Sequence, residues 1–316
     1  MSEPRHFLTL GDLTSEGIEG LLRRAEEFRL LRSLRQPHAT RPGRVLGMVF
    51  EKSSTRTRAS FEVGMFELGG HALSLDARGT QIGRGEPIAD TARVLAGYCH
   101  AIMIRTFGQA RAQEMAKFSS VPVINGLTDL LHPCQLLADL QTVSQRFVAR
   151  GRDLGEVLRS VRYAWIGDGN NMANSWIEAA GILGLDLALC CPPRYMPDET
   201  IVAQARATGR GRVVFEETPV AAAVGRHVLS TDVFTSMGQE AEQEERRQAF
   251  AGYCLDAPLL AAADKAAIVL HCLPAHRGEE VTPGVIDGPQ SVVFQEAENR
   301  MHAQKALMQL LLENSL

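Results

Sequence analysis

Short apolar runs rich in β-branched residues alternate with helical segments along the chain, and this alternation restricts the possible folds more than any other feature. The expected strands cover residues 45–50, 71–75, 101–104, 121–124, 162–166, 187–191, 213–215, 228–229 and 268–270. Strands separated by helices pair in parallel, because each helix returns the chain to the same end of the sheet. Ligands then bind at the carboxyl ends of the strands. The sequence therefore predicts an α/β protein built on doubly wound parallel sheets.

The chain is long enough for two such domains. It has 316 residues, of which 45% are hydrophobic and 22% charged, an ordinary globular balance. A long helix over residues 136–150, opened by Pro133, ends just before Gly151, where we expect a domain boundary. We predict one domain at 1–150 and another at 151–316, joined by the long helix. A last helix at about 296–313 has an apolar stripe and is expected to pack back on the first domain.

Charge and composition argue against several classes of partner. The net charge of -4 gives no reason to expect nucleic acid or an anionic membrane. No apolar run approaches the ~20 residues that cross a bilayer, and residues 1–7 show neither a signal nor a transit pattern. We expect a cytoplasmic protein with reduced thiols, because the six cysteines form no C-x-x-C pair. A zinc site of His271, Cys272 and His276 is conceivable, but no second ligand pair has zinc spacing, so we expect no metal.

A stretch rich in hydroxyl groups and arginine lies between the strand at 45–50 and the helix that follows it. The first N–H groups of a helix lack intrahelical partners, and the helix dipole favours an anion there. Ser54, Thr55 and Thr57 add hydroxyl donors, and Arg56 adds a planar fork suited to phosphate oxygens. We interpret the stretch as a phosphate cradle. The alternative is a capped helix with two solvent-facing arginines.

Four later segments follow predicted strands or open helices, and each alone has an ordinary structural explanation. They are His132-Pro133-Cys134-Gln135, Gly167-Asp168-Gly169-Asn170-Asn171, Asp232-Val233-Phe234-Thr235-Ser236-Met237-Gly238 and His271-Cys272-Leu273-Pro274. A lone histidine such as His132 is more often structural, and Cys272 alone would be a small buried hydrophobe. The glycine-rich segment invites a dinucleotide site. However, Met172 and Ala173 occupy the places where a third glycine would be sought, so an NAD-linked dehydrogenase is a minor alternative.

These four segments follow a fifth, Phe50-Glu51-Lys52-Ser53-Ser54-Thr55-Arg56-Thr57-Arg58. In this order and rough spacing, the five segments together resemble the aspartate/ornithine carbamoyltransferase family over nearly the whole chain. The Ser236-Met237-Gly238 loop points to the branch of the family that uses ornithine. The resemblance implies transfer of a carbamoyl group from carbamoyl phosphate to the δ-amine of L-ornithine, giving citrulline and phosphate in arginine biosynthesis. One departure is Phe234, where many members have tryptophan, and it puts the packing of the loop in doubt.

The resemblance also implies roles for individual residues. Those expected to bind carbamoyl phosphate are Ser54, Thr55, Arg56, Thr57, Gln81, Arg105, His132, Gln135, Cys272, Leu273 and Arg300. Those expected to bind ornithine are Asn171, Asp232, Ser236 and Met237. Arg105, His132 and Cys272 are the expected catalytic groups. The implied assembly is a homotrimer or a multiple of trimers, with Gln81 supplied by a neighbouring subunit. No cofactor is expected, because a mixed anhydride is already activated.

Two alternatives share the carbamoyl-phosphate half of this interpretation. The chain could use a different amine, such as putrescine or an acylated ornithine, although Asp232 would then lack an α-ammonium partner. It could also be a catalytically silent subunit that binds carbamoyl phosphate. The presence of Arg56, Arg105, His132 and Cys272 argues against a silent subunit.

Overall fold

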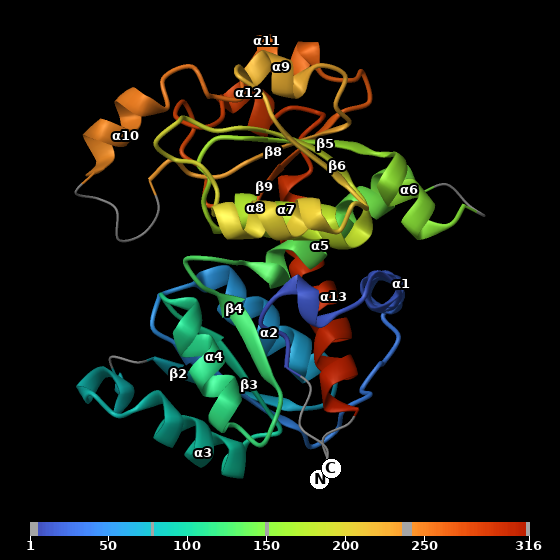
Figure 1. Cartoon of the computed structure of the whole chain (residues 1–316). Coiled ribbons are helices and arrows are strands. Elements are labelled where there is room, and N and C mark those ends of the chain that lie inside the picture. The colour runs from blue at the N-terminus through green and yellow to red at the C-terminus, as the bar shows by residue number, and fades with distance from the viewer. Residues whose placement is uncertain (1–5, 77–78, 149–151, 236–241, 314–316) are drawn as a thin grey trace. The chain divides into compact units, whose positions relative to one another are not determined.

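The computed structural model describes residues 6–76, 79–148, 152–235 and 242–313. The chain forms two compact units, one of Met1–Gln141 with Glu298–Leu316 and one of Thr142–Ala297. Each is a parallel α/β unit, so the predicted fold class is confirmed (Figure 1). The division falls between Gln141 and Thr142, within helix α5 (Pro133–Phe147), whereas we expected a boundary after residue 150. The prediction differs because it ended the first domain at the end of the helix.

The first unit is built on a four-stranded parallel sheet in the order β2-β1-β3-β4. Its strands are β1 (Val45–Phe50), β2 (His71–Asp76), β3 (Ala101–Arg105) and β4 (Val123–Leu127). Its helices are η1 (Leu10–Asp12), α1 (Ser15–Ser33), α2 (Thr55–Glu67), η3 (Ile82–Arg84), α3 (Ile88–Tyr98), α4 (Gln109–Phe118), the first part of α5, and most of α13 (Val293–Leu312). The C-terminal helix therefore belongs mainly to this unit.

The second unit is built on a five-stranded parallel sheet in the order β7-β6-β5-β8-β9. Its strands are β5 (Arg162–Ile166), β6 (Asp186–Cys190), β7 (Arg212–Phe215), β8 (Val228–Thr231) and β9 (Ile268–His271). Its helices are α6 (Leu154–Ser160), α7 (Asn171–Leu183), α8 (Glu199–Ala207), α9 (Pro219–Ala223), α10 (Gln243–Ala249), α11 (Ala257–Ala262) and α12 (Pro283–Ile286). Because the strands of each sheet are parallel, their carboxyl ends lie at one edge of that sheet, and the predicted site residues other than Arg300 follow strands there.

Strand register in the first unit brings two predicted segments to the same edge. Phe50, the last residue of β1, pairs with Arg105, the last residue of β3. The next residue, Glu51, donates its backbone N–H to the Arg105 carbonyl at 2.9 Å. The turn into α2 and the side chain of Arg105 thus start from adjacent points, as parallel pairing requires.

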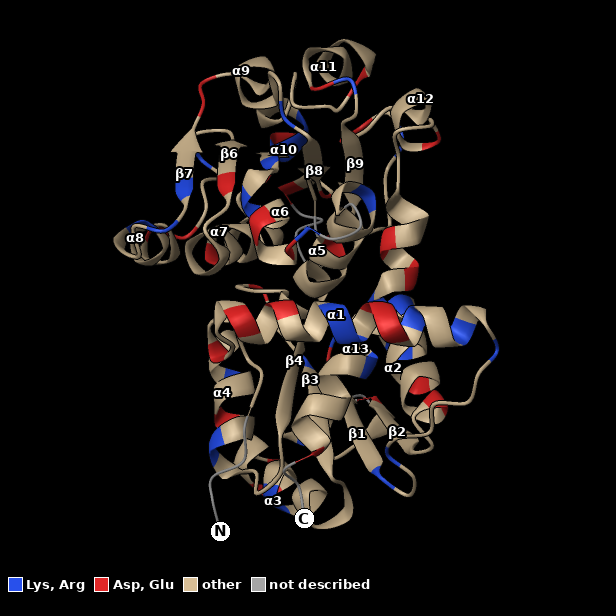
Figure 2. Cartoon of the chain, turned by 90° about the vertical axis from the view of Figure 1, so that its right-hand side faces the viewer, with Lys and Arg blue, Asp and Glu red and all other residues tan. Residues whose placement is uncertain are grey.

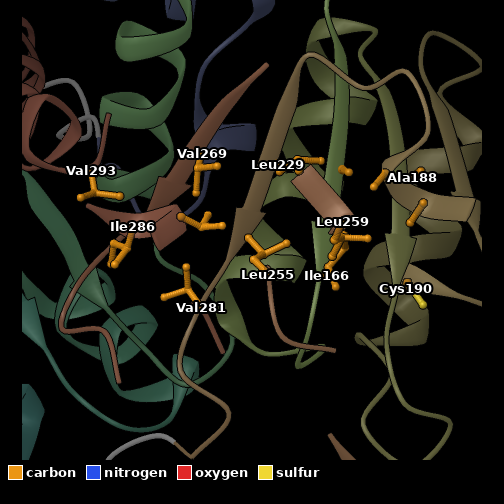
Figure 3. Packing of buried hydrophobic residues seen from close by; sticks show 14 residues of the cluster. Ile166, Ala188, Cys190, Leu229, Leu255, Leu259, Val269, Val281, Ile286 and Val293 are labelled. Carbon is orange, nitrogen blue, oxygen red and sulfur yellow. The ribbon is translucent and has the colours of Figure 1, made fainter. Parts of the chain in front are cut away.

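The core of the second unit lies between its sheet and the helices that cover it. Figure 3 shows Ile166, Leu229 and Val269 from three neighbouring strands, with Leu255 and Leu259 packed against them. All five are buried. Strands covered on both faces need apolar residues at nearly every position, which explains why these runs lack the polar alternation of half-exposed strands.

Surface charges are mixed along the helices that face water. On α1, acidic and basic residues intersperse (Figure 2), and Arg24 pairs with Glu27 and Arg29 with Glu26, in each case three residues apart. Within the described ranges, none of the helices combines the length and the apolar character needed to cross a membrane.

Leu229 provides a test of the second core. We expect Leu229→Ala to lower the free energy of unfolding by about 2–5 kcal/mol, because the lost side chain leaves a cavity between β8 and its covering helices. Urea unfolding followed by circular dichroism measures the change. Val220→Ala, at a side chain 54% exposed in the same unit, should shift it by less than about 0.5 kcal/mol. Equal losses in both variants would contradict this packing.

Candidate functional site

The predicted cradle forms the N-terminus of α2. Ser54 has extended backbone angles and caps the helix, since its hydroxyl accepts a hydrogen bond from the Thr57 N–H at 3.2 Å. Phe61 and Met65 anchor the opposite face of the helix in the core. Capping and anion binding are thus compatible, because one cap satisfies only one of the first N–H groups of the helix.

Two guanidinium groups converge on the hydroxyl of Thr57. Arg300 on α13 donates to Thr57 Oγ1 at 2.8 Å, and Arg105 at the end of β3 donates to the same oxygen at 3.3 Å. Thr57 and Arg300 are buried, and Arg105 is half-buried. Holding two cations this close is unfavourable unless an anion is near, and the positive end of the helix dipole adds to the positive potential. The arrangement is therefore suited to a multiply charged anion.

The same positive potential affects the pKa of His132. Its side chain is buried, and burial together with the nearby charges of Arg300 and Arg105 holds the pKa of His132 well below its ordinary value. A neutral imidazole at this position can donate one hydrogen bond and accept another. Three residues later, the Gln135 amide donates to Asp139 Oδ1 at 2.8 Å, which fixes its orientation on α5.

Other predicted cradle residues are more open to solvent. Arg56 is half-buried and Thr55 is exposed, both in the first turn of α2. Gln81 is exposed at the start of η3, in the loop after β2. Ser54, Arg56 and Thr57 are thus held by the same helix turn, whereas Gln81 belongs to another segment, and its role across a subunit interface stays a prediction.

In the second unit, the Asp232 carboxylate at the end of β8 is the centre of a hydrogen-bond network. Its Oδ2 accepts from Asn170 Nδ2 at 3.0 Å, and its Oδ1 accepts from the Val233 N–H at 2.8 Å and from the Cys272 thiol at 3.1 Å. Asn171 is half-buried at the first position of α7. Asp232, Asn171 and Cys272 therefore come from three segments at one edge of the sheet.

Asn170 was not singled out from the sequence. Its side-chain oxygen caps α7 by accepting from the Met172 and Ala173 N–H groups, while its amide donates to Asp232. An Asn just before a helix predicts a cap. The second contact, to a residue 62 positions away, needs the tertiary structure.

The two glycines before Asn170 have structural reasons of their own. Gly167 has φ +136, and a Cβ there would lie 3.1 Å from the Thr231 hydroxyl. A Cβ on Gly169 would lie 2.3 Å from backbone atoms of Met196 and Pro197. Close approach of the backbone to neighbouring segments thus explains the two glycines, although their spacing superficially suggests a dinucleotide-binding motif.

Asp168, between these glycines, forms a buried ion pair with Arg246 of α10. Burial raises the pKa of Asp168 to about 7, the guanidinium opposes this shift, and the charge of Asp232 adds to it. Arg246 also donates to the Phe234 carbonyl at 2.5 Å and lies over the Tyr195 ring at 4.4 Å. Asp168 has its own counter-ion, whereas the contacts to Asp232 described above come from neutral groups.

The His271-Cys272-Leu273-Pro274 segment follows β9 and is held by buried acids. The Leu273 N–H donates to His271 Nδ1 at 2.9 Å, so the imidazole proton is on Nε2, 3.1 Å from Glu280 Oε1. Glu296 accepts from the His271 N–H at 2.9 Å. Leu273 has φ +57, a conformation that side chains other than glycine rarely adopt, so these contacts maintain an unfavourable backbone.

The three residues that suggested a zinc site, His271, Cys272 and His276, separate into two groups. Atoms of Asp232, His271 and Cys272 lie within 4.8 Å of one another, whereas His276 is grouped with Glu279 and Glu280. Both ring nitrogens of His271 already have hydrogen-bond partners. The arrangement fits a hydrogen-bond network better than the ligand set we considered.

Two expected ornithine contacts, Ser236 and Met237, lie outside the described residues. Phe234 is buried and stacks on Phe250, with ring centroids 4.5 Å apart. The phenylalanine therefore fills its site, which answers the doubt about its packing. Cys272 and Leu273, expected in the carbamoyl-phosphate pocket, belong to the second unit, where the Cys272 thiol contacts Asp232.

Comparison with known proteins adds independent findings. Residues 5–145 match the carbamoyl-P binding domain of the aspartate/ornithine carbamoyltransferases, and residues 159–311 match their Asp/Orn binding domain. The chain is 53% identical over 308 residues to the ornithine carbamoyltransferase of Pelobacter propionicus, covering 98% of each chain. It is 55% identical to that of Halorhodospira halophila, over 98% of this chain and 99% of the other.

A solved structure is similarly close. The ornithine carbamoyltransferase from Pyrococcus furiosus superposes with a TM-score of 0.91 at 44% identity, over 99% of this chain and 98% of that one. The resemblance inferred from the motifs is therefore confirmed.

The charge state of the His132 imidazole tests the burial and the positive potential described above. We expect the imidazole to stay neutral at pH 6, because its side chain is buried and because protonation would place a third cation beside Arg105 and Arg300. Since the unfolded chain takes up this proton below about pH 6.5, the contribution of His132 to the free energy of unfolding should fall as the pH drops below that value. Ring ¹⁵N shifts, assigned with His132→Asn, measure the charge state. Imidazolium shifts at pH 6 would contradict the electrostatic description.

Proposed function

The chain belongs to the aspartate/ornithine carbamoyltransferase family, and we propose that it transfers the carbamoyl group of carbamoyl phosphate to the δ-amine of L-ornithine, giving L-citrulline and phosphate. The observation that carries the proposal is the convergence of Arg105 and Arg300 on Thr57 at a helix N-terminus. Relatives named ornithine carbamoyltransferase, about half identical over nearly the full length, support the choice of amine.

Carbamoyl phosphate is a dianionic mixed anhydride, and the first unit offers what it requires. The phosphate oxygens are bound by hydroxyl groups, a guanidinium and the N–H groups of the first turn of α2, which are supplied by Ser54, Thr55, Arg56 and Thr57. Arg105 and Arg300 neutralise the charge that grows on phosphate as it leaves. The relief of repulsion between these two guanidinium groups adds to the affinity for the dianion.

The carbamoyl carbonyl needs donors that act on its oxygen as an amine attacks. His132 is suited to this task because its depressed pKa keeps it a neutral hydrogen-bond donor. Arg105 reaches both phosphate and carbonyl oxygen, and Gln135 holds the carbamoyl amide. Donors fixed in position before the reaction stabilise the tetrahedral oxyanion by roughly 3–4 kcal/mol each. The activated anhydride carries the driving force, so the proposal requires no cofactor.

Ornithine carries opposite charges on its α-carbon substituents. In the proposed complex Asp232 accepts from the α-ammonium, while Asn171, Ser236 and the Met237 backbone hold the α-carboxylate. Asn170 and the Cys272 thiol orient the Asp232 carboxylate. An amine without an α-ammonium, such as putrescine, would leave this buried carboxylate without its cation, and this cost favours ornithine.

The δ-amine attacks as the neutral base. With a lysine-like pKa of about 10.4, only roughly one molecule in a thousand is neutral at pH 7. Departing phosphate can accept the proton that the amine loses, because its second pKa is near neutrality. The backbone carbonyls of Cys272 and Leu273 are acceptors for N–H groups of the reacting carbamoyl group and amine.

The assembly we propose is a homotrimer or a multiple of trimers, with Gln81 acting in the site of a neighbouring subunit. Its support is the resemblance, together with apolar side chains that a monomer would leave in water. Phe66 is 77% exposed on α2, with Val63 one turn before it and Leu73 on the edge strand β2 also exposed. The proposed cytoplasmic location and the role in arginine biosynthesis rest on the resemblance.

Citrulline formation tests the reaction. We expect product from carbamoyl phosphate with L-ornithine, and little with aspartate, putrescine or N-acetylornithine in parallel. Arg56→Ala should lower kcat/KM by roughly 10²–10³, the loss expected for one donor to a developing charge. Arg58→Ala is the matched control, because Arg58 stands on the same helix but pairs with Glu62 at the surface. Product with another amine alone would overturn the assignment of ornithine.

The trimer can be tested at Phe66. We expect Phe66→Glu to shift the assembly to monomers in light scattering coupled to size exclusion, because a charge replaces an apolar contact between copies. Leu34→Glu, at a side chain 66% exposed beyond the end of α1, is the control and should leave the mass unchanged. A monomeric wild-type chain, or a Phe66→Glu variant of unchanged mass, would contradict the proposed interface.

A further inference from the structure

Helix α13 contacts α2 at a second point besides the Arg300–Thr57 hydrogen bond. Five residues after Arg300, the ammonium of Lys305 donates to Glu67 Oε2 at 2.7 Å, and Glu67 is the last residue of α2. The Lys305 side chain is fully buried. The two ends of α2 are therefore each tied to α13, one through a hydroxyl and one through an ion pair (Figure 1).

Between these contacts, the two helices meet at a glycine. A Cβ on Gly64 would lie 3.2 Å from Lys305 Cγ and 3.2 Å from Met308 Cε, closer than most real contacts of this kind. With a Cβ at this position, the Lys305 and Met308 side chains would have to move by a few tenths of an ångström. Gly64 thus permits the close approach of the two helices, and the polar contacts limit their relative sliding and rotation.

Glu67 is shared among several partners. Arg32 of α1 pairs with it, and His38 Nε2 lies 3.3 Å from it. The Lys305 ammonium also lies 3.0 Å from His38 Nε2 and 5.2 Å from the centre of the Phe28 ring. Glu67 therefore keeps two partners when Lys305 is replaced, and such a replacement does not leave a buried carboxylate alone.

A buried lysine is an unfavourable means of joining two helices. Burial and the charge of Arg32 lower the pKa of Lys305 to about 7, against the ordinary lysine value near 10.4. Buried ion pairs often contribute no more stability than an apolar pair of similar volume. Apolar contacts are non-directional, whereas an ion pair specifies one position along and around the helix. We therefore explain the Lys305–Glu67 ion pair by the helix position that it specifies and not by the stability that it adds.

We propose that Lys305 is a positioning residue, whose ion pair with Glu67 fixes α13 on α2 so that the Arg300 guanidinium lies against Thr57. Five residues correspond to about 7.5 Å along the helix, so a small slide at Lys305 is transmitted to Arg300 by a rigid element. The inference rests on the proposed function in one respect: it takes carbamoyl phosphate as the anion that binds at Thr57 and Arg300.

The test measures binding of carbamoyl phosphate to the full-length protein by calorimetry, without any amine. Lys305→Met removes the charge and keeps a long apolar side chain. We expect its Kd for carbamoyl phosphate to rise by roughly three- to tenfold, since displacements near 1 Å have large effects on aligned groups. Arg24→Met is the matched control, because it removes a 2.7 Å contact between α1 and Gln309 of α13 and leaves α2 untouched. Its Kd should equal that of the wild type.

A double-mutant cycle separates positioning from a general structural effect. If Lys305 acts through Arg300, Lys305→Met should add no further loss in an Arg300→Gln background. Additive losses, or a wild-type Kd in Lys305→Met, would overturn the proposal. If Lys305→Met fails to fold, Glu67→Ala decides, because it removes the carboxylate that accepts from the Lys305 ammonium. A wild-type Kd in Glu67→Ala would then overturn it.

The outcome is separable from that of the proposed function. Carbamoyl-phosphate binding that weakens in Lys305→Met supports the positioning role even if the wild-type chain forms no citrulline. Citrulline formation combined with unchanged binding in the variant would support the reaction and overturn the role of Lys305.

Discussion

The convergence of the Arg105 and Arg300 guanidinium groups on Thr57 is the interaction on which the proposed site of the first unit depends. Both guanidinium groups donate to one buried hydroxyl at the positive end of α2, and burial together with their charges depresses the pKa of His132 nearby. A protein region that concentrates positive charge in this way is most stable with a multivalent anion present. Two guanidinium groups this close repel each other, and we propose that the Lys305–Glu67 pair holds α13 in place against this repulsion. The proposed affinity for phosphate and the proposed positioning of the C-terminal helix thus have one cause.

The second unit has the opposite electrostatic character. Asp168 and Asp232 both lie buried near the carboxyl ends of the strands, but Asp168 is neutralised by Arg246. Asp232 is surrounded by an amide, a backbone N–H and a thiol, which orient a carboxylate without cancelling its charge. The first unit therefore suits an anion and the second an ammonium, in agreement with the two substrates we propose.

The sequence also contains residues whose reasons are purely geometric. Gly167 and Gly169 stand in a pattern that resembles part of a nucleotide-binding motif, yet one has a backbone conformation that favours glycine and the other lets a loop approach closely. Glu280 and Glu296 hold His271 and so maintain the positive φ of Leu273. Neither acid was singled out from the sequence, because a glutamate buried by partners distant in space looks like any surface glutamate in one dimension.

The sequence by itself determined the alternation of strands and helices, the capped turn of the cradle and the family, because each depends on residues close along the chain or on motifs in a fixed order. It missed the short helices α6, α9, α10, α11 and α12, since four to seven residues give too few turns for a period to be visible. Only the tertiary structure decided the contacts Arg300–Thr57, Asn170–Asp232 and Lys305–Glu67, which span 243, 62 and 238 residues. Contacts over such separations follow from how helices and strands pack, and local pattern carries no information about that packing.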